Sequence, residues 1–292
     1  MAVATIGLID TWLAARLKPE AHAWFDAQVA RVAGRAGAER AKALFMAWSA
    51  AGRHVGKADL ALEPGDLARA SQARPGWSPA RWSVDQLARA RLLLALPADD
   101  LAWLATLDRL CAAADLAELV AFYQALPLLP HPERLRARAA EGVRSNIRAV
   151  FDAVALDNPY PAERLDEGAF NQLVLKALFV GAPLGRVIGV DGRGNAALMR
   201  TLIDFAHERR AAGRAVPIDL WRLVGAHADE RALADLAALL SSDEPAERQA
   251  AALALHACPD PAARVALDRS PEARRALASG ALSWDSLVHP AR

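Results

Sequence analysis

The sequence predicts an all-α protein, a superhelical array of antiparallel helix pairs with HEAT-like repeats at its C-terminus. Apolar residues recur at three- and four-residue spacing along most of the 292 residues, as on the buried face of a helix. Alanine, the strongest helix former, makes up roughly a quarter of the chain. Near the C-terminus, short helical phrases alternate with acidic-proline turns.

The N-terminal half divides into a series of predicted helices. The start signals fit this division, because Ser83 precedes a helix with Asp85 in its first turn, and Pro97 opens the next helix. The irregular stretch 53–65 is predicted as a loop. The predicted helices cover residues 5–17, 20–33, 37–51, 64–73, 83–96, 98–113 and 115–126.

A proline-rich segment, LPLLPHPE (126–133), follows and marks a candidate subdomain break. The prediction is therefore one helical domain over 1–292, with a candidate N-terminal subdomain 1–126 and a C-terminal subdomain 133–292. Long helices are expected near 133–156, 167–180 and 195–212. The glycine-rich stretch 181–195 between them lacks the glycine spacing of a nucleotide loop.

Residues 229–280 differ from the rest of the chain in pattern, because short predicted helices alternate with acidic-proline turns. The phrase SSDEPAERQAAALAL resembles the turn and second helix of a HEAT-type repeat, in which an Asp-Pro turn leads into an arginine-bearing helix. The same period is not found in the first half. Such repeats usually build scaffolds, so this region predicts an interaction role.

The composition excludes several classes of protein. A formal net charge of +1 gives no basic field for nucleic acid or membrane surfaces, so neither is an expected partner. No apolar run approaches the about 20 residues that span a bilayer, and the N-terminus does not read as a signal peptide. Cys111 and Cys258 lie far apart without metal-site spacing, which favours free thiols in the cytoplasm.

The first candidate site is a polar pocket within apolar helices. On a helical wheel, Asn146 falls inside the apolar arc of 141–156, whereas Glu141 lies on the polar stripe. In FNQLVLKALF, Gln172 and Lys176 stack one turn apart and Asn171 sits between leucines. These groups either tie adjacent helices together, with Lys176 reaching the surface, or surround a ligand. If Lys176 is buried, desolvation lowers its pKa, which would suit a catalytic base or nucleophile.

A second candidate is DFAHERR, where Asp204 and His207 share a helix face with Arg200 and Glu208. An Asp-x-x-His pair can hold a metal or orient a base, but a solvated charged face explains it as well. No third ligand stands at a telling spacing, so no metal or other cofactor is predicted.

A third candidate is GWSPARWSVDQLARARLLL (76–94). Trp77 and Trp82 flank a turn, and Asp85 and Arg89 lie four residues apart, as in an ion pair. The tryptophans either anchor a loop on the core or serve a partner interface. No nucleophile elbow, Cys-His pattern or paired-aspartate motif is present, so enzymatic activity stays open and is not favoured.

Three stretches together resemble the EboA-domain family. They are residues 76–94, 140–181 and 191–216, and the most specific is NPYP (158–161) followed by an aromatic-NQ-x-V-L-K-A-L-F helix. Relatives often carry Trp at the position of Phe170 and Met at that of Leu173, both conservative differences.

The resemblance implies a context more than a mechanism. Genes of the family occur in a bacterial cluster with a UbiA-type membrane prenyltransferase, a sugar-isomerase-like barrel protein, a metal-dependent-hydrolase-like protein and a dehydroquinate-synthase-like protein. It implies an accessory or scaffold role in handling and export of a secondary-metabolite precursor, through partner proteins of the cluster or a small hydrophobic metabolite. No catalytic residues carry over from it.

Overall fold

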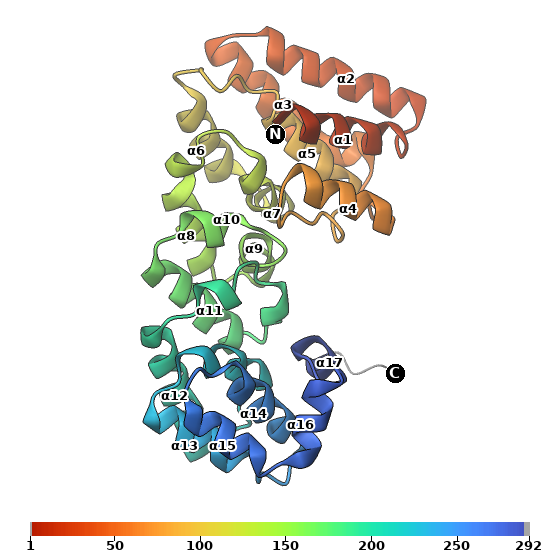
Figure 1. Cartoon of the computed structure of the whole chain (residues 1–292). Helices are drawn as coiled ribbons and strands as arrows, with labels where there is room; N and C mark the ends of the chain where they lie inside the picture. The colour runs from red at the N-terminus through yellow and green to blue at the C-terminus, as the bar shows by residue number, and fades with distance from the viewer. Residues whose placement is uncertain (1, 289–292) are drawn as a thin grey trace. The chain divides into compact units, whose positions relative to one another are not determined.

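The computed structural model describes residues 2–288 and is helical throughout, with no strand among those residues (Figure 1). The all-α prediction is confirmed. The chain forms two compact units, Met1–Leu165 and Asp166–Arg292. The proline-rich segment 126–133 lies inside unit 1, and unit 2 begins in the chain after Leu165. Met1 and residues 289–292, which the predicted domain 1–292 includes, lie outside the described residues.

Unit 1 is organised around a row of helices in which each packs on the next (Figure 1). The row consists of α3 (Gly37–Val55), α5 (Val84–Leu93), α7 (Leu116–Ala125) and α9 (Arg148–Ala155). Beside it pack α1 (Ala2–Ala14), α2 (Pro19–Gly34), α6 (Trp103–Ala113) and α8 (Arg136–Arg144). Two further helices, α4 (Pro64–Ala73) and α10 (Tyr160–Arg164), and the 3-10 turns η1 (Leu126–Leu128) and η2 (Pro132–Leu135) complete it.

Local sequence explains where these helices begin. Proline stands in the first turn of α2 and α4, where its missing N–H is not needed. Ser83 and Asp115 begin α5 and α7 with reciprocal capping boxes. Several boundaries differ from the predictions. The helix α3 continues to Val55 into the expected loop, α6 begins only at Trp103, and α1 ends at Ala14 and not at residue 17.

The predicted long helix 133–156 is wrong in one respect that matters for the site. It is interrupted between α8 and α9, where the Ile147 N–H donates to the Ser145 hydroxyl at 3.2 Å. Such a local side-chain bond competes with the helical ladder. Asn146 lies in this interruption and is exposed, so it does not belong to a buried apolar face.

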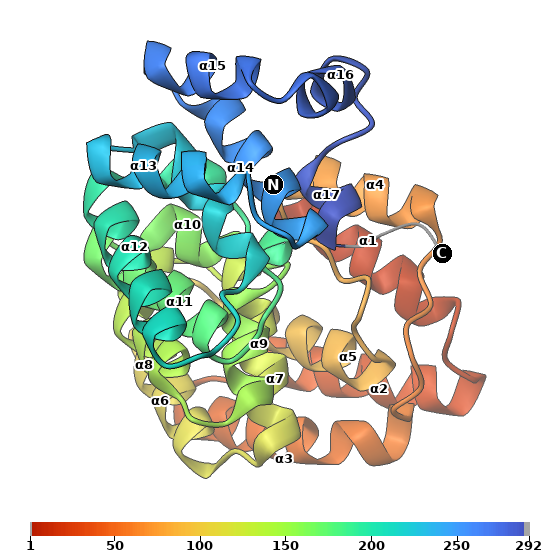
Figure 2. The same cartoon turned by 90° about the horizontal axis from the view of Figure 1, so that it is seen from below.

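Unit 2 is arranged around α14 (Pro245–Ala257) (Figure 2). This helix packs on α13 (Glu230–Leu239), α15 (Pro261–Asp268), α16 (Pro271–Ala278) and α17 (Trp284–Val288). It also contacts the turns η5 (Ile218–Leu223) and η6 (Gly225–His227). The remaining elements are α11 (Glu167–Phe179), η3 (Leu184–Arg186), η4 (Asp191–Arg193) and α12 (Ala196–Ala211).

The tightest approach in unit 2 joins η6 to α14. A Cβ added to Gly225 would lie 1.9 Å from the Ala254 carbonyl oxygen, well inside van der Waals contact. The alanines facing it, Ala250 to Ala252 and Ala254, are almost fully buried. Only glycine allows the two backbones to come this close.

We therefore expect Gly225→Ala to lower the free energy of unfolding by about 3 kcal/mol or more, since backbone rather than a flexible side chain must move. Gly192→Ala is the matched control, because a Cβ at Gly192 meets nothing within 4 Å. Chemical denaturation of both variants measures the difference. Equal unfolding midpoints would contradict the close approach.

Candidate functional site

A cavity of ≈ 670 Å³ lies in unit 1. Its wall comes from the start of α1, the end of α5, the proline-rich segment and α10. The lining is mainly apolar and contains Pro127, Pro130 and Pro132. The remaining lining residues are Thr5, Ile6, Arg74, Leu94, Leu96, Ala98, Leu128, Leu129, Tyr160, Glu163 and Arg164.

Asn158 holds Tyr160, which lines one side of this cavity. Its buried side-chain amide donates to the carbonyl oxygens of Tyr123 (3.0 Å) and Ala153 (3.1 Å), and its Oδ1 accepts from the Tyr160 N–H at 3.0 Å. The amide thereby joins the ends of α7 and α9 to the start of α10. Both N–H groups of its Nδ2 are therefore used, and the hydrogen bond that its Oδ1 accepts holds the Tyr160 backbone in place.

The phenol of Tyr160 closes the same side. Its hydroxyl donates to the Pro132 carbonyl oxygen, and the ring is almost fully buried. Burial raises the pKa of Tyr160 to about 12, against the opposing effect of Arg136 and Arg164, so the phenol is neutral at physiological pH.

An ion pair crosses the cavity wall between α4 and α10. Arg74 binds both carboxylate oxygens of Glu163, at 2.7 and 2.6 Å, and its Nε donates to the Pro127 carbonyl oxygen at 2.9 Å. Such a two-pronged pair is the strongest geometry for arginine and carboxylate. It connects the proline-rich segment to both helices.

We expect Asn158→Asp to destabilise unit 1 by about 2–4 kcal/mol at neutral pH, since a carboxylate there would face two carbonyl oxygens. The introduced carboxyl is disfavoured as an anion in the folded state, so its folded pKa is raised. The loss is complete above that folded pKa and diminishes as pH falls through it. Denaturation midpoints from pH 8 to pH 5 measure this, with the exposed Asn146→Asp as control. A loss independent of pH would contradict the amide's role.

The residues of the predicted polar pocket are divided between the two units. Glu141 and Asn146 are exposed residues of unit 1, and Glu141 pairs with Arg138 at 2.6 Å. Asn171, Gln172 and Lys176 belong to α11 in unit 2. Gln172 is exposed, as is Phe179 at 77%, so this helix does have a solvent side.

Asn171 has a structural partner within its own unit. It exchanges hydrogen bonds with Asn195, at 2.9 and 3.3 Å, while Asn195 caps α12 through the Leu198 N–H. This is the helix-tying role weighed for the polar residues. Lys176 is half-buried, and burial lowers its pKa, in the direction predicted.

Around Glu141 lies a smaller cavity of ≈ 450 Å³ that also touches Cys111 and Tyr123. Burial raises the pKa of Cys111 and that of Tyr123 each to about 12. Neither group therefore supplies an anion for catalysis at neutral pH.

The Asp204–His207 candidate is part of a charged hydrogen-bonded network. His207 Nε2 contacts Asp235 at 2.8 Å, and Arg231 contacts both His207 Nδ1 (2.7 Å) and Asp204 (2.9 Å). Both ring nitrogens are thus engaged. No group of three metal-ligating side chains occurs among residues 2–288.

The remaining members of that face are on the surface. Arg200 lies 3.8 Å from Asp229, and Glu208 is exposed. The network joins α12 to α13 and leaves no lone pair on His207 for a ligand.

The tryptophan candidate proves to be core. Trp77 and Trp82 are 1% and 5% exposed and pack edge to face at 5.8 Å, so they are not a partner surface. Asp85 and Arg89 form a fully buried ion pair, and Arg89 Nε donates to the Trp48 carbonyl oxygen at 3.2 Å. They anchor the turn before α5, as in the first alternative.

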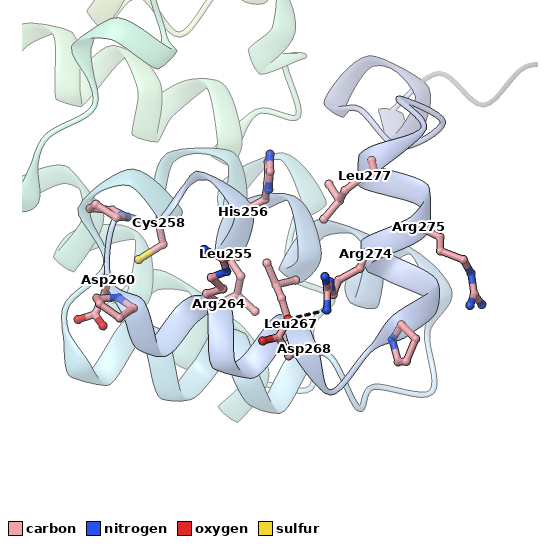
Figure 3. A pocket seen from close by; sticks show the side chains of 14 residues that line it. Leu255, His256, Cys258, Asp260, Arg264, Leu267, Asp268, Arg274, Arg275 and Leu277 are labelled. Carbon is pink, nitrogen blue, oxygen red and sulfur yellow. Dashed lines mark ion pairs between the residues drawn. The ribbon is translucent and has the colours of Figure 1, made fainter.

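In unit 2, a crevice of ≈ 860 Å³ opens between α14, α15 and α16 (Figure 3). Its floor contains Leu255, Leu267 and Leu277. Figure 3 shows Arg264 projecting from α15 toward the end of α14, and Arg275 projecting outward from α16. Sequence reasoning assigned this region to repeats without predicting a crevice.

Comparison with known families decides the identity of the chain. Residues 5–225, more than half of its length, match the family described as metabolite traffic protein EboA. The chain belongs to the EboA family. No curated protein and no solved structure matches it. The proline-lined cavity of the EboA-family protein lies within the matched residues, whereas the crevice of unit 2 lies outside them.

The sequence resemblance to this family is thus confirmed. Among the described residues, no helix combines the length and apolar character needed to cross a bilayer. Sequence reasoning noted NPYP as a family phrase but gave Asn158 and Tyr160 no role. The available signal was an asparagine before proline, which commonly bonds the backbone two residues on.

Proposed function

We propose that this protein binds a small, largely apolar metabolite in the proline-lined cavity and thereby handles a pathway precursor. The single observation that carries the proposal is that Tyr160, from the most specific family phrase NPYP, lines a cavity large enough for a ligand. Small-molecule sites typically measure about 300–1,000 Å³ and are mainly apolar. The family's description as a metabolite traffic protein agrees with such a role.

The polar groups of the wall favour binding over catalysis. The Tyr160 hydroxyl donates to Pro132, and the carboxylate of Glu163 is held by Arg74 at both oxygens. A general base needs a free lone pair within reach of a substrate proton. An enzyme acting through Asn146, Asn171 and Lys176, or through Asp204 and His207, has less support, because Asn146 is exposed and His207 is engaged at both nitrogens.

We expect Leu128→Trp to weaken binding of N-phenyl-1-naphthylamine, a neutral apolar fluorophore, by about tenfold or more, since the larger ring occupies the cavity. Leu128 lines the cavity, while the control residue Leu101 is 99% exposed and lies outside it. Fluorescence titration of the wild type, Leu128→Trp and Leu101→Trp measures the affinities. Equal affinities in both variants, or no binding by the wild type, would contradict the proposal.

Partner binding is the second candidate function, and the crevice of unit 2 favours it. We propose that the crevice binds an acidic amphipathic helix of another protein encoded in the same gene cluster. The UbiA-type prenyltransferase is one of the candidate partners. The apolar floor suits the apolar face of a helix. Asp260 caps α15 and Asp268 pairs with Arg274 at 2.8 Å, so both carboxylates of the crevice are engaged.

Two arginines of the crevice then remain for the partner. Among the described residues, the side chains of Arg264 and Arg275 make no hydrogen bond or ion pair, and both residues are exposed. This leaves a positive rim around an apolar floor.

The proposal also includes a HEAT-like repeat character for 229–280, supported by proline at the start of α14, α15 and α16 and by the packing of α13, α14 and α15 on one another. A cytoplasmic location is proposed as well, supported by the free thiols of Cys111 and Cys258.

We expect Arg264→Glu combined with Arg275→Glu to weaken a partner complex by about tenfold or more, because attraction to an acidic helix becomes repulsion. Arg269→Glu is the control, since Arg269 is exposed at the end of α15 but does not line the crevice. Each purified cluster protein is titrated against the three versions at two salt concentrations. A partner that binds all versions equally would show that it docks elsewhere.

A further inference from the structure

The charges in the wall of the proline-lined cavity do not balance. Three of its lining residues are ionised: Arg74, Glu163 and Arg164. Arg74 and Glu163 neutralise each other through two hydrogen bonds. This leaves the positive charge of Arg164 without a counter-charge in the wall.

Arg164 is half-buried, and part of its guanidinium has no partner in the protein. Its Nε is buried and has no hydrogen-bond partner, and no ion pair involves its guanidinium among the described residues. A buried donor without a hydrogen bond costs the folded protein on the order of 1–3 kcal/mol, and more when the group is charged. A free-energy gain is therefore available to any group that neutralises this side chain.

Neighbouring groups of the protein do not provide that neutralisation. Tyr160, which interacts electrostatically with Arg164, keeps its proton because burial raises its pKa to about 12. Its hydroxyl proton is directed at the Pro132 carbonyl oxygen. Glu163, the adjacent carboxylate, is already bound by Arg74.

We propose that the metabolite is an amphiphilic acid, whose carboxylate or phosphate binds Arg164 while its apolar body lies against the prolines and leucines of the cavity. This inference rests on the proposed function and adds the chemical class of the ligand. The planar guanidinium suits both acidic groups, since it can donate two parallel hydrogen bonds to either.

Two fluorophores that differ only in one acidic group test the proposal. N-phenyl-1-naphthylamine is neutral, and 1-anilinonaphthalene-8-sulfonate is the same molecule with a sulfonate. We expect the wild type to bind the sulfonate about tenfold more tightly than the neutral probe. Displacement of the sulfonate by 1-naphthoate and by 1-naphthyl phosphate then distinguishes a carboxylate ligand from a phosphate ligand, and 1-naphthol serves as the neutral competitor.

Variants of the wall shift this preference in opposite directions. Arg164→Gln removes the preference for the sulfonate, whereas Arg164→Lys keeps part of it through a point charge. Glu163→Gln strengthens it, because Arg74 then loses its counter-charge. The control Arg53→Gln, an exposed arginine outside the cavity, leaves both affinities unchanged.

The outcomes separate the two levels of the proposal. If the wild type binds neither probe, the cavity is not a binding site and the proposed function fails. If it binds the neutral probe as tightly as the sulfonate, or if Arg164→Gln keeps the preference, the acidic-ligand inference is overturned while the cavity remains a site for apolar molecules.

Discussion

The candidate site depends on one buried amide. The Asn158 side chain satisfies backbone groups from α7, α9 and α10 at once, and these three elements carry the proline-rich segment and Tyr160 to their places. An apolar residue of similar size would take one donor from each of two carbonyl oxygens, those of Tyr123 and Ala153, and the first would keep only the Leu126 N–H. The row of helices gives unit 1 its core, but the amide determines where α10 lies and so gives the cavity its closed side.

The sequence was sufficient for the helices and insufficient for the cavity. Helical periodicity predicts most of the helices, because its signal is local, within one or two turns; the interrupted segment 133–156 is the exception. The cavity joins Thr5, Leu96, Pro127 and Tyr160, which are far apart in the chain, so no local pattern brings them together. The same holds for the ion pair between Arg74 and Glu163.

The helical wheel failed at Asn146 for a physical reason. A wheel assumes that the backbone stays helical, but the Ser145 hydroxyl accepts the Ile147 N–H and ends that ladder. The tryptophans left two alternatives open, since Trp and Arg are common both in a core and in an interface. Burial, which the sequence does not contain, decides between them.

The prolines of the cavity wall have a consequence for the kinetics of exchange. Pro127, Pro130 and Pro132 have fixed φ angles, so this wall is ordered before a ligand arrives and little conformational entropy is lost on capture. They also present no N–H groups, which leaves shape and the few side-chain charges to hold the proposed ligand. Under the proposed function, such a wall lets the ligand enter and leave without refolding.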